Sequence, residues 1–286
     1  MPEVTQPPEE NATLVDWTSV TTCQNLRILE IKHQVGGSPT FEQLANLLAS
    51  SPMLEVLDIT GYCPTAKTLP IQTRTLLIQL PALKRLAFGW SRVDLACDFL
   101  KLFQISETLE TLELTDMESG LGLCKRAGSG LFDYNGDSSE IFKTLTSLAS
   151  GRSKEELSSP RISTLGLKNL SVSWVKSDTK AVSAFLRGAP MIKEIRLTDV
   201  DEGVLNGIAA HVIVGPLGPQ SPKVGIQWIW NGRNISDSAC MVTSLLEGLG
   251  DDKLQVSIER FGGNNCGFTP IALKARLDDG SVGWGS

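Results

Sequence analysis

Apolar residues recur along this chain at a nearly fixed interval, each time inside a short alternating segment. The intervals are 28, 29, 26, 53, 30, 29 and 30 residues, and the anchors that define them are Leu29, Leu57, Leu86, Leu112, Leu165, Ile195, Val224 and Leu254. Alternation of this kind is typical of a strand with one buried face. Intervals of this length are typical of stacked structural repeats. The sequence therefore predicts eight strands, one in each of eight repeated units.

Between the predicted strands the apolar spacing changes to that of a helix, which gives each unit one strand and one helix. The apolar faces of the expected helices are Phe41/Leu44/Leu47/Leu48, Val93/Ala96/Phe99/Leu100/Phe103, Ile141/Leu145/Leu148, Val182/Phe185/Leu186, Val204/Leu205/Ile208/Val212 and Met241/Leu245/Leu246/Leu249, with a less regular one at Leu69/Leu76/Leu77/Leu80. These residues are expected to form the core.

The strand segments share the pattern L-x-x-L-x-L, as in Leu54/Leu57/Ile59 and Leu109/Leu112/Leu114. This pattern resembles that of leucine-rich repeat proteins. The strings SPMLEVLDITGY (51–62), LPALKRLAF (80–88) and APMIKEIRLTDV (189–200) resemble, more narrowly, the repeat regions of fungal F-box proteins. The resemblance implies an α/β horseshoe with a parallel sheet on its concave side. It also implies the substrate-recognition part of a ubiquitin-ligase receptor.

The sequence departs from these families in two places. The position that holds Asn or Cys in regular leucine-rich repeats holds Gln34, Tyr62, Ser91, Met117, Leu170 and Val200, so the turns must close by other means. About 25 residues precede the first predicted strand, and MPEVTQPPEEN does not have the pattern of a helical core. We therefore expect no F-box segment in this sequence, whether it was lost, truncated or never present.

Composition fits one repeat domain in the cytoplasm or nucleus. Apolar residues make up 41% of the 286 residues, and the formal net charge of −6 gives no reason to expect nucleic acid as a partner. No apolar run reaches the ~18 residues of a membrane span, and no signal-peptide core is present. We expect a monomer divided into an amino-terminal cap or tail at 1–22, a repeat domain at 23–260 and a carboxy-terminal cap or tail at 261–286.

The sequence carries no pattern typical of a catalytic or cofactor site. His33 and His211 are the two histidines and lie far apart, the six cysteines are scattered, and a Gly-Lys dipeptide is lacking. Asp133, Asn135 and Asp137 imitate the start of an EF-hand loop, but the later Gly and Glu are missing. We therefore expect neither an enzyme nor a bound metal or cofactor.

The concave face is the predicted binding surface, because neighbours of a buried anchor point away from the core. In the first four strands this face holds Lys32 and Arg85 against Glu30, Asp58 and Glu113, a net charge of −1; in the last four it holds Lys168, Arg196, Lys223 and Lys253 against Glu194, a net charge of +3. A cationic half-groove would suit an acidic or phosphorylated peptide. A solvated face with a chance imbalance of charge is the alternative.

Two further features are candidates for partner contact. Trp90, just after the third predicted strand, is expected either as an exposed aromatic anchor or packed against a loop. The interval between Leu112 and Leu165 is about 24 residues longer than the others, and a Gly- and Ser-rich insertion at about 116–139 accounts for it. That insertion could be a lid, a partner-binding loop or a disordered segment.

These observations lead to two hypotheses. The first is a protein-interaction scaffold that resembles the substrate-recognition part of an F-box receptor. Its partner-binding residues would be Arg85, Trp90, Glu113, Lys168, Arg196, Lys223 and Lys253. The second is a leucine-rich regulator of a small GTPase, similar in architecture to Ran GTPase-activating proteins.

Overall fold

The computed structural model describes residues 26–31, 39–60, 77–117, 137–151, 161–214, 223–230 and 254–260. For residues 212–214, 223, 226–230 and 254–260 it describes the backbone alone. The predicted terminal caps at 1–22 and 261–286, the expected helix at Met241–Leu249 and residues 118–136 of the predicted insertion lie outside the described residues.

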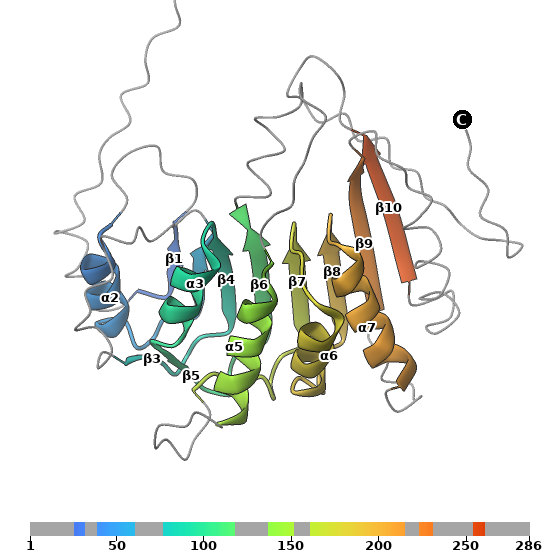
Figure 1. Ribbon diagram of the computed structural model, residues 1–286. Helices are drawn as coiled ribbons and strands as arrows, with labels where there is room; N and C mark the ends of the chain where they lie inside the picture. The colour runs from blue at the N-terminus through green and yellow to red at the C-terminus, as the bar shows by residue number, and fades with distance from the viewer. Residues whose placement is uncertain are drawn as a thin grey trace, which may run out of the picture.

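Within the described residues, eight strands form one parallel sheet in the order β1-β2-β4-β6-β7-β8-β9-β10 (Figure 1). Their bounds are β1 Ile28–Glu30, β2 Val56–Ile59, β4 Arg85–Trp90, β6 Thr111–Asp116, β7 Asn169–Ser173, β8 Glu194–Thr198, β9 Lys223–Trp230 and β10 Leu254–Arg260. Successive strands pair without a shift, so that Leu29, Leu57, Leu86 and Leu112 lie in one row across the sheet. The predicted alternation of strand and helix is therefore confirmed, and the chain belongs to the α/β class.

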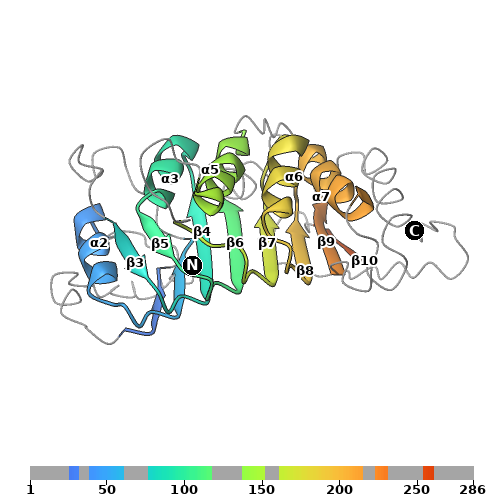
Figure 2. The same ribbon diagram turned by 90° about the horizontal axis from the view of Figure 1, so that it is seen from below.

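The helices of the described residues all lie on one side of the sheet (Figure 2). They are α2 Phe41–Ala49, α3 Val93–Leu100, α5 Ser139–Ser150, α6 Thr179–Arg187 and α7 Glu202–Val214. Local sequence sets their first turns: Thr40 and Gln43 form a reciprocal capping box at α2, and the Asp178 carboxylate accepts from the Ala181 N–H at α6. None of the described helices is long and apolar enough to cross a membrane.

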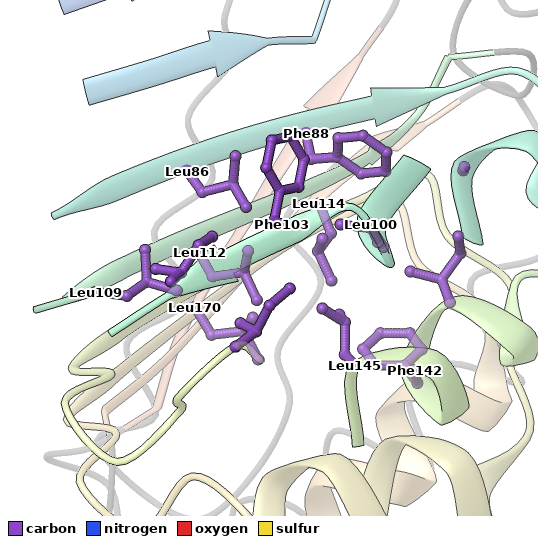
Figure 3. Close-up of a cluster of buried hydrophobic side chains, with 14 of the residues drawn as sticks. Leu86, Phe88, Leu100, Phe103, Leu109, Leu112, Leu114, Phe142, Leu145 and Leu170 are labelled. Atoms are coloured by element: carbon purple, nitrogen blue, oxygen red, sulfur yellow. The ribbon is translucent and has the colours of Figure 1, made fainter. Parts of the chain in front are cut away.

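The core lies between the sheet and the helices (Figure 3). Leu86 and Leu112 from neighbouring strands belong to one hydrophobic cluster with Phe142 and Leu145 of α5, and all four side chains are fully or almost fully buried. The predicted apolar faces of α2, α5 and α6 are confirmed, because their apolar residues are buried. Burial of a core leucine or phenylalanine contributes about 1.5–3 kcal/mol, so this layer is the main source of stability.

Two predicted helical segments end in strands. The Val93–Leu100 part of one is helical as predicted, and Leu69 and Leu76 of the other lie outside the described residues. Leu80 belongs to β3 (Ile78–Leu80) and Phe103 to β5 (Phe103–Ile105), which pair in parallel as a separate two-stranded sheet. Ile162 continues this small sheet through a bridge to Ile105. Each strand is only three residues long, so an apolar spacing of two was read as part of a helical period.

The fifth predicted anchor is also wrong. Leu165 is 54% exposed, whereas Leu170 is buried and pairs with both Leu112 and Ile195. Leu167, Leu170 and Val172 satisfy the same L-x-x-L-x-L pattern five residues further on. The corrected interval from Leu112 is 58 residues. It holds one helix, α5, and the Ile162 bridge, in the same order as α3 and β5 between β4 and β6, and it includes residues 118–136 and 152–160, which lie outside the described residues.

Candidate interaction surface

The side of the sheet opposite the helices carries mostly polar side chains, and we call it the polar face. Its members come from every second position of β1 to β8: Ile28, Glu30, Val56, Asp58, Arg85, Ala87, Thr111, Glu113, Thr115, Asn169, Ser171, Ser173, Glu194, Arg196 and Thr198. The strand alternation that buries the anchors places these residues on the opposite side of the sheet, where Asp58 and Ala87 are nevertheless buried. The polar face is therefore the surface that the sequence pattern predicts for binding.

An ion pair joins β4 to β6 on the polar face. The Arg85 guanidinium donates from Nε to Glu113 Oε1 at 2.7 Å and from Nη2 to Glu113 Oε2 at 3.1 Å. This two-pronged geometry is the strong form of an arginine–carboxylate contact. It raises the pKa of Arg85, and the charges of Asp58 and Glu30 add to the effect. Arg85 is thus held in place by the protein's own carboxylates.

The neighbouring strands approach closely at Gly89. A Cβ on Gly89 would lie 2.4 Å from the Thr60 carbonyl oxygen, a distance that no side chain tolerates. Beside it, the buried Asp58 carboxylate accepts from the Thr60 N–H at 3.2 Å and from the Thr60 hydroxyl at 2.7 Å. The carboxyl ends of β2 and β4 are therefore tightly packed. The open part of the polar face lies over later strands of the sheet.

A shallow depression of about 200 Å³ lies over β6, β7 and β8. It is lined by Thr111, Glu113, Asn169, Leu170, Ser171, Glu194 and Arg196. The Asn169 side-chain amide donates to the Thr111 hydroxyl at 3.2 Å, which fixes the amide orientation. Ser171 lies at the centre, between Glu113 and Arg196 in the sheet register. Short polar side chains at this point leave room for an extended segment of a partner.

The two cations of the predicted half-groove whose side chains are described, Arg196 and Lys168, each pair with a carboxylate. Arg196 donates from Nε to Glu194 Oε1 at 2.8 Å, and this contact raises the pKa of Arg196. Its side chain is nevertheless 71% exposed, so a partner can reach it. Lys223 begins β9 beside Glu194, and its side chain is outside the described part. Lys253 lies outside the described residues altogether.

Lys168 is not on the polar face, because the strand it was assigned to begins one residue later, at Asn169. It precedes the strand, in a row of charged residues at the end of the sheet where the strands begin. We call this row the entry ladder; it consists of Arg27, Glu55, Lys84, Glu110, Lys168 and Lys193. The Lys168 ammonium donates to Glu110 Oε1 at 2.6 Å.

Trp90 is buried, with 2% of its surface exposed, so it is not a partner anchor. Its ring stacks with Phe88 at a centroid distance of 6.1 Å, and its indole N–H donates to the Ser138 hydroxyl at 3.3 Å. Trp90 follows Leu86 and Phe88 at the same spacing of two, so strand alternation places it in the core. That signal was present in the sequence.

Asn169 and Ser171 line the depression and were not among the predicted binding residues. The five-residue error at Leu165 moved the predicted surface positions of this strand to Thr164, Gly166 and Lys168. Of these, Thr164 is buried, and a Cβ on Gly166 would meet the Glu107 carbonyl oxygen. Applying the pattern to LKNLSV (167–172) would have placed both Asn169 and Ser171 on the surface.

The described residues contain no group of three or more His, Cys, Asp and Glu side chains arranged to hold a metal ion. Comparison of the chain with protein-family models, with curated proteins and with solved structures gives no match. The interpretation of the polar face therefore depends on its own geometry.

Proposed function

We propose that this protein is a non-enzymatic interaction scaffold of the leucine-rich repeat type, and that a segment of a partner protein binds across β6, β7 and β8. One observation carries the proposal: the polar face has a depression centred on Ser171, lined by side chains held by their own contacts. Groups already fixed in position lose little conformational entropy on binding. Such a surface favours recognition of a polypeptide.

The chemistry of the depression supports binding over catalysis. Glu113 and Glu194 are each held by an arginine. A general base or nucleophile needs a group with a shifted pKa that is free to exchange a proton. Ion-paired side chains lack that freedom, while they can donate and accept hydrogen bonds to a partner backbone.

The repeat pattern extends the proposal to a class of scaffold. Because the sequence resembles the repeat regions of fungal F-box proteins, we propose that the bound partner is a substrate selected for ubiquitination. The scaffold is placed in the cytoplasm or nucleus, and no nucleic acid or membrane is involved.

The test compares two serine-to-tyrosine variants in an affinity-capture experiment read by mass spectrometry. Ser171→Tyr fills the depression, whereas Ser147→Tyr adds the same group at an exposed position of α5. We expect Ser147→Tyr to capture the same partners as the parent protein and Ser171→Tyr to lose at least one of them. An identical partner set for all three proteins would contradict the proposal.

The ubiquitination step has a separate readout. A captured substrate should be longer-lived in cells that carry Ser171→Tyr than in cells that carry Ser147→Tyr, because the receptor no longer selects it. If the lifetimes are equal although capture is lost, the protein is a scaffold without a role in degradation.

A further inference from the structure

The entry ladder has a regular backbone. The carbonyl oxygen of each of the first five ladder residues accepts two N–H groups from the next unit, those of the next ladder residue and of the residue after it. Arg27 accepts from Glu55 at 2.8 Å, Glu55 from Lys84 at 2.8 Å, and so on to Lys168, which accepts from Lys193 at 2.7 Å. Neighbouring side chains therefore start about 4.8 Å apart along the edge of the sheet.

Charge alternates along most of this row. Glu55 lies between two cations and accepts from Arg27 at 3.2 Å and from Lys84 at 2.7 Å. Glu110 follows and accepts from Lys168 at 2.6 Å. The contacts with the lysines lower the pKa values of Glu55 and Glu110. Glu55 is thus shared by the cations on its two sides, whereas Glu110 pairs with Lys168.

The alternation stops at Lys193. Lys168 and Lys193 are consecutive members of the ladder, so two cations stand where a cation and a carboxylate alternate elsewhere. The Lys168 ammonium is directed to Glu110, on the side away from Lys193. Among the described residues, no carboxylate pairs with Lys193, whose side chain is exposed; the nearby Glu194 is bound to Arg196. The six ladder residues hold four cations and two carboxylates.

We infer that an acidic side chain of the partner protein binds beside Lys193 and completes the ladder, an inference that depends on the proposed function. Lys168 and Lys193 immediately precede Asn169 and Glu194, which line the depression. A segment lying in the depression therefore passes the entry ladder at this point. An Asp or Glu carboxylate there repeats the arrangement in which Glu55 is shared by Arg27 and Lys84.

The surroundings favour one carboxylate over a dense polyanion. Glu110 and Glu194 flank the two lysines, and the chain as a whole carries a net charge of −6. Their field repels a phosphate backbone or a cluster of phosphates, whereas one carboxylate between two ammonium groups is neutralised locally.

The inference is tested with a labelled peptide and the full-length chain. The probe is a fluorescein-labelled Gly/Ser peptide with four Glu residues, and its fluorescence anisotropy is followed at low ionic strength and at about 150 mM salt, where charges are screened beyond about 8 Å. We expect binding to weaken with salt, and Lys193→Glu to weaken it about fivefold or more at low salt. Lys180→Glu, the same charge reversal at an exposed position of α6, should leave binding unchanged.

Two further probes separate the sources of negative charge. A peptide with Gln in place of Glu should not bind, and a peptide with phosphoserine in place of Glu should bind no more tightly than the Glu peptide. Equal losses for Lys193→Glu and Lys180→Glu would overturn the inference, as would binding of the Gln peptide. Tighter binding of the phosphoserine peptide that requires Lys193 would overturn the assignment of a carboxylate. Lys193→Gln is a control for misfolding. Its circular dichroism spectrum should match that of the parent, so that a loss of binding is due to the missing charge.

The outcome is distinguishable from that of the proposed function. Partner capture that depends on Ser171, together with peptide binding that ignores Lys193, would overturn only the acidic contact. If peptide binding requires Lys193 but partner capture is unchanged by Ser171→Tyr, the proposed binding site in the depression would be overturned. The entry ladder would then be supported as an anion site.

Discussion

The two ends of the sheet use polar groups in opposite ways. Where the strands begin, the entry ladder keeps its charged groups at the surface; the side chains of Arg27 and Lys84 are 69% and 58% exposed. Where the strands end, polar groups are linked between units; Trp90, Asp116, Ser138, Ser139 and Ser177 are buried there, whereas Asp137 and Asp178 are exposed. We call this second group the exit network; it consists of Trp90, Asp116, Asp137, Ser138, Ser139, Ser177, Asp178 and Asp201.

The difference shows which polar contacts stabilise the stack. A buried polar group that loses its partner costs about 1–3 kcal/mol, whereas an exposed ion pair contributes about 0–1 kcal/mol. The exit network therefore contributes to holding neighbouring units together. The exposed charges of the entry ladder contribute little to stability.

The exit network also explains how the turns close. At the position where regular leucine-rich repeats carry Asn or Cys, this chain buries Met117, Val175 and Val200. The hydrogen bonds come instead from separate side chains, such as Asp201, which accepts from the Ser177 N–H at 3.2 Å and the Val204 N–H at 3.1 Å. Apolar residues at the usual Asn or Cys position are consistent with these contacts, because apolar groups occupy the interior and the polar groups are paired elsewhere.

The largest expected effect is at Trp90 in the exit network. Trp90→Ala removes a fully buried ring that packs on Phe88 and should destabilise the fold by about 3–5 kcal/mol. The matched change in the entry ladder, Lys84→Ala, should leave the denaturant midpoint nearly unchanged. Chemical denaturation of both variants measures the difference. Similar losses for the two would show that the ends of the sheet do not differ.

A smaller loss is expected at Ser139, the first residue of α5. Its hydroxyl accepts from the Asp178 N–H at 2.7 Å and from the Ser177 hydroxyl at 3.3 Å, and it donates to Asp137. Ser139→Ala leaves the Asp178 N–H without a partner, so we expect a loss of about 1–3 kcal/mol. Ser147→Ala, at an exposed position of the same helix, is the control and should be neutral within about 0.5 kcal/mol. An unchanged stability in Ser139→Ala would mean that water replaces the hydroxyl.

The sequence was sufficient for what depends on period. Alternation around Leu57, Leu86 and Ile195 predicted the strands and the surface positions of Arg85 and Glu113, because burial on one face of a strand is visible in one chain. It failed where an unusually long interval allowed two placements, at Leu165 and Leu170. The three-residue strands β3 and β5 were missed because two apolar positions do not define a period.

The contacts between units were beyond the reach of the sequence. The pairs Arg85–Glu113 and Glu110–Lys168 join residues 28 and 58 positions apart, and they determine which cations remain available. Counting charges on the predicted strands assigned Lys168 to the groove, although Lys168 precedes the strand and pairs with Glu110. Lys193, which was counted nowhere, became notable only after the ladder pairs were known.

Asp201 of the exit network is expected to show a pH dependence opposite in direction to that of Glu55 and Glu110 in the entry ladder, whose pKa values are lowered. Partial burial raises the pKa of Asp201, and the charge of nearby Asp137 adds to this, while the Val204 and Ser177 N–H groups and the charge of Lys176 oppose it. A carboxyl whose pKa is higher in the folded than in the unfolded chain destabilises the fold when ionised. Its contribution to stability therefore falls as pH rises from about 3.9, the unfolded value, through the folded pKa.

Asp201→Asn removes this ionisation and keeps an oxygen that can accept both N–H groups. We expect the variant to be at least as stable as the parent at pH 7. As the pH is lowered toward 4, the free energy of unfolding of the parent should rise relative to that of the variant. Urea denaturation at a series of pH values measures the difference. If the parent instead becomes less stable relative to the variant on acidification, the direction of the pKa shift would be contradicted.

The smallest expected effect on stability is in the entry ladder. It tests the alternation of charge along the ladder in the absence of a partner. Lys193→Glu places a carboxylate beside Lys168 and extends the pattern by one member, so it should raise the melting temperature slightly at low ionic strength. The gain should vanish at high salt, because exposed charges are screened there. Lys193→Gln removes the same cation without supplying a carboxylate and should gain less than Lys193→Glu. A lower melting temperature for Lys193→Glu at low salt would mean that the carboxylates of Glu110 and Glu194 already saturate this end of the row, and the acidic side chain inferred for the partner would then have no place to bind.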